Sequence, residues 1–211
     1  MSQSDTKIRI LDAAEHLFAR HGFHNTSMRA ITSEAEANLA AANYHFGSKE
    51  ALLQAVFERR LVPLNQQRTE RLRHIVGQAE QAGILPDVRD LMRAFIEPTL
   101  TFRNQDRGTR AFVSLIGRSM VEMDSTSRDC FIPLIEPLFK LLFTSLQRAL
   151  PHLPPAILLT RLQFAMGAMG RTLCAPDQTP LQVDVESSPS NSEAVAEALI
   201  GFVSAGLEAP C

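Results

Sequence analysis

Apolar residues recur at intervals of three and four positions along almost the whole of this 211-residue chain. This interval is the period of an amphipathic α-helix, whereas a half-buried strand alternates apolar and polar residues. The helical spacing is clear near the start of the chain, at Ile8, Leu11, Ala14, Leu17 and Phe18. The sequence therefore predicts an all-α fold.

Capping residues divide the N-terminal region into short helices. After a first helix, Thr26 is suited to cap a second one, and Asn38 precedes a third, predicted over residues 39–45. Ser48 is suited to cap a long fourth helix. Three short helices followed by a connector are the layout of a helix-turn-helix domain. We therefore assign residues 1–47 to such a domain, with the connector helix beginning at residue 48.

The remaining chain, residues 48–211, has the pattern of a larger helical bundle. Prolines mark several predicted helix starts, and a Pro-, Ser- and Asp-rich stretch at 175–190 is predicted to be a loop. One predicted helix is apolar on nearly all sides, and such a helix is buried at the centre of a bundle. That helix covers residues 109–123. A further predicted helix runs to about residue 150 and is interrupted by Pro133 and Pro137. The others cover residues 86–101, 155–173 and 191–207.

Several classes of protein are disfavoured by what the sequence lacks. No run approaches the roughly 18 apolar residues of a membrane span, and the N-terminal residues lack the uninterrupted apolar core of a secretory signal, so we expect a cytoplasmic protein. The cysteines, Cys130, Cys174 and Cys211, form no CxxC pair, so we expect neither a disulfide framework nor a metal site. There is no nucleophile elbow, Walker loop or GxGxxG. We therefore expect no catalytic residues and no cofactor.

Charge does not indicate a nucleic-acid partner. The net charge is −2, and residues 1–60 contain seven basic and seven acidic side chains. Binding to DNA needs local lysine and arginine on the phosphates. A prediction of DNA binding must therefore rest on the motif and its geometry.

The motif lies in TSMRAITSEAEANLAAANYHFGSKEALLQAVF, residues 26–57. Small side chains at 40–42 let the third helix enter a major groove about 12 Å wide. Leu39 is suited to thymine methyl groups, and Asn43 can donate to and accept from base edges, while hydroxyl, ammonium and guanidinium groups nearby suit phosphates. The predicted DNA-binding residues are Thr26, Ser27, Arg29, Asn38, Leu39, Ala40, Asn43, Tyr44, His45 and Lys49. An alternative for Tyr44 is that its ring packs against the first helix.

These residues resemble the N-terminal domain of the TetR family. The resemblance is carried by the order Thr-Ser-x-x-x-Ile followed by Asn-Leu-Ala-Ala-x-Asn-Tyr-His-Phe-Gly-Ser-Lys-Glu-x-Leu, within residues 7–57. The ending NYHFGSKEALLQAVF is similar to the fatty-acid- and acyl-CoA-responsive regulators of the PsrA type. The resemblance implies a repressor that binds a palindromic operator as a homodimer and that a small effector releases.

One residue departs from the family pattern. Members usually carry glycine in the turn between the second and third helices, where this chain has Glu36. A residue other than glycine at positive φ costs on the order of 1 kcal/mol, and a carboxylate there lies near DNA phosphates. Two outcomes remain open: either the turn is remodelled, or the affinity for the operator is lowered.

The resemblance further implies that the two C-terminal helices of each subunit pair in the dimer. Gly167 and Gly170 in the segment FAMGAMG give one helix a face of low relief, which a partner helix can approach closely. The apolar side of the final helix is expected to carry Val195, Leu199, Phe202 and Val203. The alternative is that these faces pack only within the subunit.

The C-terminal bundle has the composition of an adaptable apolar pocket. Twelve Phe and seven Met against one Tyr and no Trp suit a flexible acyl chain, such as that of a fatty acid or an acyl-CoA. The predicted ligand-binding residues are Leu91, Phe95, Phe112, Leu115, Ile116, Arg118, Met120, Phe139, Phe143 and Phe164. A solid core is the alternative.

Arg118 belongs to this set because a buried guanidinium needs an anion, which a ligand carboxylate or phosphate can supply. An internal partner such as Glu97 or Glu122, or exposure to solvent, is the alternative for this residue.

Two classes of function account for these features. The first is a ligand-released repressor with no enzymatic activity. The second is a helical carrier of lipids or other small molecules that has no DNA role, and it explains the acidic balance and Glu36. It leaves the alanine-rich third helix, with Tyr44 and the nearby Lys49, unexplained.

Overall fold

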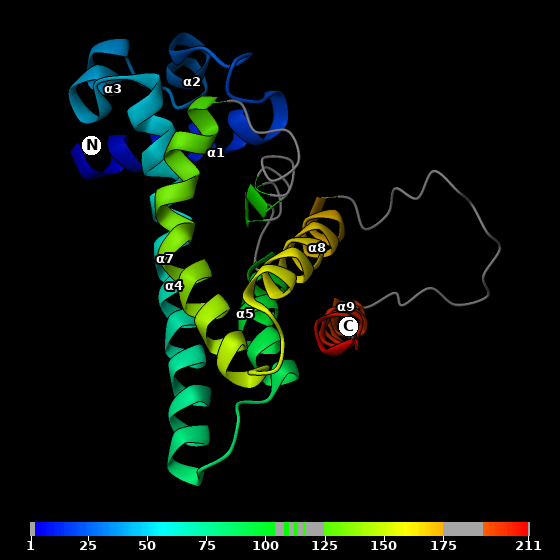
Figure 1. Cartoon of the computed structure of the whole chain (residues 1–211). Coiled ribbons are helices and arrows are strands. Elements are labelled where there is room, and N and C mark those ends of the chain that lie inside the picture. The colour runs from blue at the N-terminus through cyan, green and yellow to red at the C-terminus, as the bar shows by residue number, and fades with distance from the viewer. Residues whose placement is uncertain are drawn as a thin grey trace, which may run out of the picture. The chain divides into compact units, whose positions relative to one another are not determined.

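The computed structural model describes residues 3–103, 108–109, 112–113, 116, 125–174 and 192–210 (Figure 1). Within these ranges every regular element is a helix, which confirms the predicted all-α fold. The helices are α1 (Gln3–His21), α2 (Met28–Glu34), α3 (Leu39–Phe46), α4 (Lys49–Ala82), α5 (Val88–Arg103), α7 (Ser125–Ala149), α8 (Pro155–Cys174) and α9 (Ser192–Glu208). None of the described helices is long and apolar enough to cross a membrane.

The chain forms two compact units. The first contains Met1–Pro63 and Arg103–Ile135, and the second contains Leu64–Phe102 and Glu136–Cys211. Helices α4 and α7 therefore each contribute residues to both units. The first unit extends beyond residue 47, where the sequence predicts the end of the helix-turn-helix domain, since it also contains the start of α4 and the start of α7.

The core of the first unit is built around Phe57 of α4, which is fully buried. Its ring lies 6.0 Å from the ring of Phe112 and 5.8 Å from the ring of Phe131 in α7, measured between centroids. Helix α1 contributes Phe18 and α2 contributes Ile31, both with no exposed surface. Large apolar side chains from α1, α2, α4 and α7 are therefore buried in the first unit.

Side-chain caps determine where the short helices begin. The carboxamide of Asn38 accepts a hydrogen bond from the Ala41 amide at 2.7 Å, and the Ser48 hydroxyl accepts one from the Ala51 amide at 3.1 Å. Both caps agree with the prediction. Together they satisfy amide groups that have no partner within the helices themselves.

The predicted cap of α2 is wrong by one residue. Ser27 is the cap, and its hydroxyl accepts a hydrogen bond from the Ala30 amide at 3.1 Å. Thr26 is buried, and its hydroxyl donates to the carbonyl of Gly22 at 2.8 Å and to that of Leu17 at 3.3 Å. It therefore stabilises the turn between α1 and α2 from inside the unit.

Ion pairs connect the helices of the second unit. Glu197 of α9 pairs with Arg93 of α5 and, at 3.0 Å, with Arg89; the hydrogen bonds from these two guanidinium groups lower the pKa of the Glu197 carboxyl. Helix α8 packs against α9, and Arg161 of α8 donates to the carbonyl of Leu207 at 2.9 Å. These contacts hold the last helix to the rest of the unit.

Prolines do not end the long helices of the body. Helix α7 continues through Pro133 and Pro137, where the sequence predicts an interruption. Both prolines are exposed, so water can hydrate the carbonyl groups that lose an amide partner there. Of the predicted helix 109–123, Thr109, Phe112, Val113 and Ile116 are described, and all four are buried and helical. The predicted loop 175–190 lies outside the described residues.

Replacement of Phe57 tests the central role of its ring. We expect Phe57→Ala to lower the free energy of unfolding by about 3–5 kcal/mol, because the ring leaves a cavity between two other rings. Chemical denaturation followed by circular dichroism measures this change. Tyr44→Ala, which removes an exposed ring, serves as the control and should alter stability by less than about 0.5 kcal/mol. Equal losses in both variants would contradict the assignment.

Candidate nucleic-acid interface

Helix α3 presents one face to solvent and buries the other. It packs against α1 and α2, with Ala42 fully buried. Leu39, Ala40, Asn43 and Tyr44 are exposed. The base-reading residues predicted from the sequence therefore lie where a DNA groove can reach them.

Tyr44 is the most exposed aromatic side chain of this face. Its side chain retains 76% of its accessible surface, and the edge of its ring meets the His45 ring at 5.2 Å between centroids. The alternative in which this ring packs against the first helix is therefore wrong. The half-buried His45 also meets the Phe46 ring, at 6.2 Å.

The polar residues around α3 retain unused donors. The caps Ser27 and Asn38 accept hydrogen bonds through their side-chain oxygens, which leaves the hydroxyl hydrogen and the amide NH₂ for phosphate oxygens. Arg29 is exposed and makes no ion pair within the described part of the chain. These three side chains are suited to backbone contacts with DNA.

Lys49 occupies a different position from the one expected. Its ammonium group donates to the carbonyls of Phe23 and Thr26, each at 3.0 Å, and lies 4.2 Å from the centroid of the Phe23 ring. The predicted phosphate contact therefore has to compete with two hydrogen bonds and a cation–π contact. Lys49, like the buried Thr26, stabilises the motif from within.

The turn between α2 and α3 keeps the conformation that glycine favours. Glu36 has a φ of +48°, its amide donates to the Ser33 carbonyl at 3.2 Å, and the Ala37 amide donates to the Thr32 carbonyl at 2.9 Å. These two bonds form a Schellman motif. Arg9 of α1 also donates to the Glu36 carbonyl, at 3.4 Å. The turn is not remodelled, so the first of the two outcomes left open by the sequence does not occur.

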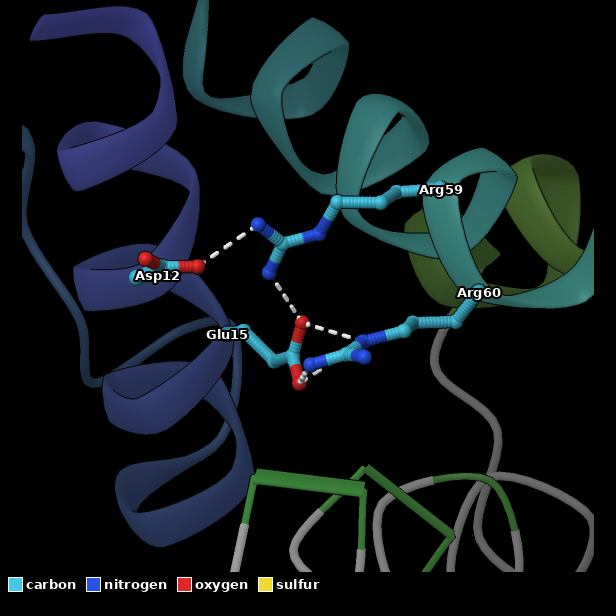
Figure 2. Close-up of polar contacts among 4 residues, drawn as sticks. All are labelled: Asp12, Glu15, Arg59 and Arg60. Carbon is cyan, nitrogen blue, oxygen red and sulfur yellow. Dashed lines mark hydrogen bonds and ion pairs between the residues drawn. The ribbon is translucent and has the colours of Figure 1, made fainter. Parts of the chain in front are cut away.

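A buried carboxylate attaches α1 to the connector helix (Figure 2). Glu15 is only 2% exposed and is bound by both Arg59 and Arg60 of α4. Arg60 binds it through Nη2 at 2.7 Å and through Nε at 3.0–3.1 Å, and Arg59 also binds Asp12 at 2.7 Å. Two of the acidic groups of the first unit are thereby neutralised away from α3. Because Arg59 and Arg60 are themselves two of the seven basic side chains of residues 1–60, these ion pairs leave the remaining charges of that segment balanced and do not make the reading face less acidic.

The predicted ligand-binding residues are divided between the two units of the chain. Leu91 and Phe95 are buried, and Phe139 and Phe143 half-buried, in the second unit, whereas Phe112 and Ile116 are buried in the first. The assignment of Phe164 to a pocket is wrong: its side chain is 71% exposed, because the register of α8 turns Leu162 and Ala165 inward instead. Leu115, Arg118 and Met120 lie outside the described residues.

Sequence analysis missed Arg68 of α4, which is 3% exposed. The segment around it is rich in charged and polar residues, so it reads as a solvated face. The available signal was its position four residues from both Leu64 and Leu72, since such spacing places all three on one side of a helix.

The fold and the exposed reading face define a helix-turn-helix DNA-binding protein with a helical C-terminal body. Residues 10–56 match the family model described as bacterial regulatory proteins, tetR family, and residues 93–206 match the one described as tetracyclin repressor-like, C-terminal domain. The second match alone covers more than half of the chain, which therefore belongs to the TetR family of transcriptional regulators. Regulators of this family bind DNA and act as dimers.

Curated relatives match over the N-terminal region. The transcriptional regulator UidR of Escherichia coli K12 is 45% identical over 51 residues, which are 24% of this chain and 26% of that protein. The nicotine-responsive transcriptional repressor HdnoR of Paenarthrobacter nicotinovorans is 40% identical over 55 residues, 26% of this chain and 28% of that protein. The chain thus matches about a quarter of the length of these relatives.

Solved structures share the fold over nearly the whole chain. The regulator PfmR of Thermus thermophilus is 21% identical, with a TM-score of 0.62 over 95% of this chain and 99% of that one. The fatty acid degradation regulator FadR of Bacillus halodurans is 15% identical, with a TM-score of 0.66 over 96% of each chain. At these identities the likeness shows the fold alone.

Substitutions of Glu36 separate the effect of its conformation from that of its charge. We expect Glu36→Gly to raise the free energy of unfolding by up to about 1 kcal/mol, because glycine adopts this φ without steric cost. Glu36→Gln keeps the strain and should leave stability nearly unchanged. Both variants should bind duplex DNA more tightly at low salt, since both remove a negative charge. A loss of stability in the glycine variant alone would contradict this explanation of the turn.

Proposed function

We propose that this protein is a repressor that binds a palindromic operator as a homodimer and is released when a small apolar effector binds its C-terminal body. The observation that carries the proposal is the exposed face of α3, with Asn43 and Tyr44 accessible beside capped helix starts. Family membership supports DNA binding and dimer formation. The relatives UidR and HdnoR are themselves transcriptional regulators.

Contacts to DNA divide into two kinds in this proposal. Leu39 and Asn43 touch base edges, with the small side chain of Ala40 allowing close approach. Ser27, Arg29, Asn38, Tyr44 and His45 contact phosphates and fix the register. Lys49 and Thr26 support the motif rather than touching the duplex, because their polar groups bind backbone carbonyls.

Exposed stripes on the last two helices support a dimer. On α8, Phe164 and Gly167 are exposed; on α9, Ala198, Phe202 and Ala205 are exposed at helical spacing. Phe202 is 71% exposed, as is Phe164. Two such rings on surfaces of small side chains are suited to burial against a second copy of the same helices.

The inner side of α9 is already occupied within the subunit. Leu199 and Val203 are buried and Val195 is half-buried. Of the apolar side predicted from the sequence, only Phe202 faces outward. The proposed interface is therefore a different face of the helix from the one that the sequence indicated.

A fatty acid or an acyl-CoA is the proposed effector class. It is supported by the phenylalanine- and methionine-rich composition of the chain and by the similarity of residues 43–57 to acyl-responsive regulators. The effector would bind preferentially to a dimer conformation in which the two α3 helices are not spaced to match the operator. Binding of the effector would therefore reduce the fraction of dimers that can bind DNA. A carrier function without DNA binding has less support, since it leaves the reading face and the family match without a role.

Selection from random duplexes tests operator recognition. We expect the selected site to be palindromic, with half-sites about 34 Å apart. Asn43→Ala should weaken binding to it by about 10- to 100-fold, because a base-edge contact is worth about 1–3 kcal/mol, with little effect on random DNA. Gln67→Ala, at an exposed position of α4, is the control and should bind normally. Binding indifferent to sequence would rule out the proposal.

Charge placed on the exposed rings tests the dimer. We expect the double variant Phe164→Glu, Phe202→Glu to be monomeric in sedimentation equilibrium, because burial of two unpaired carboxylates is unfavourable, and to lose most of its affinity for the operator. Ile84→Glu also adds a carboxylate at an exposed apolar position, outside α8 and α9, and should remain dimeric. A wild-type monomer, or an unchanged dimer in the double variant, would refute the assigned interface.

A further inference from the structure

Arg68 occupies a core position of α4. It lies between Leu64 and Leu72 on the buried side of the helix, where only 3% of its surface is exposed. Both leucines are buried as well. A guanidinium in such a position loses its hydration and is stable only if other groups compensate.

Among the described residues, the groups that contact Arg68 are uncharged. Nη1 donates to the Asn65 carboxamide at 3.2 Å, Nη2 donates to the hydroxyl of the buried Thr99, and the guanidinium carbon lies 4.6 Å from the centroid of the Phe95 ring. Nε is buried without a hydrogen-bond partner. Burial lowers the pKa of this guanidinium to about 9. Within the described residues, no carboxylate pairs with Arg68.

A neighbouring arginine of α4, Arg71, has a carboxylate partner. Arg71, three residues further along α4, pairs with Glu97 of α5 at 2.7 Å. Glu97 is one of the two internal partners, with Glu122, that the sequence offers for Arg118. Arg68 thus contacts the same helix as Arg71, at Phe95 and Thr99, but the part of the chain that the structure describes supplies no carboxylate to it.

The unused capacity of Arg68 defines the chemistry of a partner. A guanidinium has five N–H donors, and two of them are used by Asn65 and Thr99. The donors that remain can bind a carboxylate in a two-point contact. One guanidinium balances one negative charge, so a monoanion fits better than a phosphate dianion. The adjoining buried positions on α5, Leu91, Met92 and Ile96, are apolar.

We propose that Arg68 anchors the carboxylate of the effector, which is therefore an apolar carboxylic acid bound as its anion. This inference rests on the proposed function, in which the C-terminal body binds an effector, and it distinguishes between the two effector candidates. A free fatty acid carries the required charge on its apolar chain. In an acyl-CoA the end of the apolar chain is an uncharged thioester, and the negative charges lie on phosphates at the far side of the CoA group, so none is directly attached to the chain.

Arg68 lies on the same helix, α4, that is attached to the helix-turn-helix motif. Helix α4 is continuous from Lys49, which is tied to the α1–α2 turn, to Ala82. Neutralisation of Arg68 therefore acts on the same helix that carries Arg59 and Arg60. The anchor also uses Phe95, one of the residues that sequence analysis assigned to the ligand.

Binding of dodecanoate and palmitate, their methyl esters, and palmitoyl-CoA to the full chain tests the proposal by calorimetry and thermal shift. We expect at least one of the two acids to bind and to raise the melting temperature, and each ester to bind about 10- to 100-fold more weakly, because a hydrogen-bonded charge pair is lost. Arg68→Met should bind the acid as weakly as wild type binds the ester. Arg71→Met removes a neighbouring charge and should bind as wild type does.

The stability of the unliganded variant provides a second readout. Arg68→Met should melt at a temperature equal to or above that of wild type, because an apolar side chain of similar length replaces an uncompensated charge. The comparison of acid with ester in wild type remains informative even if this variant fails to fold. Ester or palmitoyl-CoA binding as tight as acid binding, undiminished acid binding by Arg68→Met, or no acid binding by wild type would each overturn the proposal.

Release of the selected operator, measured separately, distinguishes the two proposals. Acid binding that depends on Arg68 but leaves DNA binding unchanged would refute the repressor mechanism and retain the anchor. Release by an uncharged apolar ligand, equal in wild type and Arg68→Met, would retain the mechanism and refute the anchor.

Discussion

The buried carboxylate of Glu15 is the interaction on which the DNA-reading part of the molecule depends (Figure 2). It lies on α1 and is held by two guanidinium groups of α4, Arg59 and Arg60. Loss of one partner from a buried ion pair costs about 3–5 kcal/mol, because the other charge remains buried. Lys49 adds a second attachment by binding the carbonyls of the α1–α2 turn. The start of α4 is therefore attached to α1 and to the α1–α2 turn by charged and polar contacts.

Arginines along α4 differ in a way that matters for signalling. Arg59, Arg60 and Arg71 have carboxylate partners in the protein, so their positions do not depend on a ligand. Arg68 is buried, and its partners among the described residues are neutral. In the proposed mechanism, α4 thus carries two kinds of arginine. Arg59 and Arg60 attach it permanently to α1, whereas the positive charge of Arg68 is neutralised only when the effector binds. A ligand shifts a conformational equilibrium only through such a difference in interaction between states.

The turn at Glu36 shows how local strain is tolerated next to a binding surface. Its positive φ is supported by the two hydrogen bonds of a Schellman motif and by Arg9. The surrounding contacts therefore impose the geometry of the family even where glycine is absent. In the proposed complex with DNA, the carboxylate of Glu36 would lie near the phosphates and repel them. The proposed function thus predicts that the geometry of the motif favours DNA binding while the charge of Glu36 opposes it.

The sequence by itself determined the helices, the caps at Asn38 and Ser48, the helix-turn-helix motif and the family, because helical period and capping are properties of short segments. It also placed Asn43 and Tyr44 among the DNA-reading residues, and the structure leaves both exposed. Only the tertiary structure decided which side of each helix meets another. That choice buried Thr26, tied Lys49 to carbonyls, exposed Phe164 and placed Arg68 in the core. These outcomes depend on contacts between residues far apart in the chain, which no local pattern records.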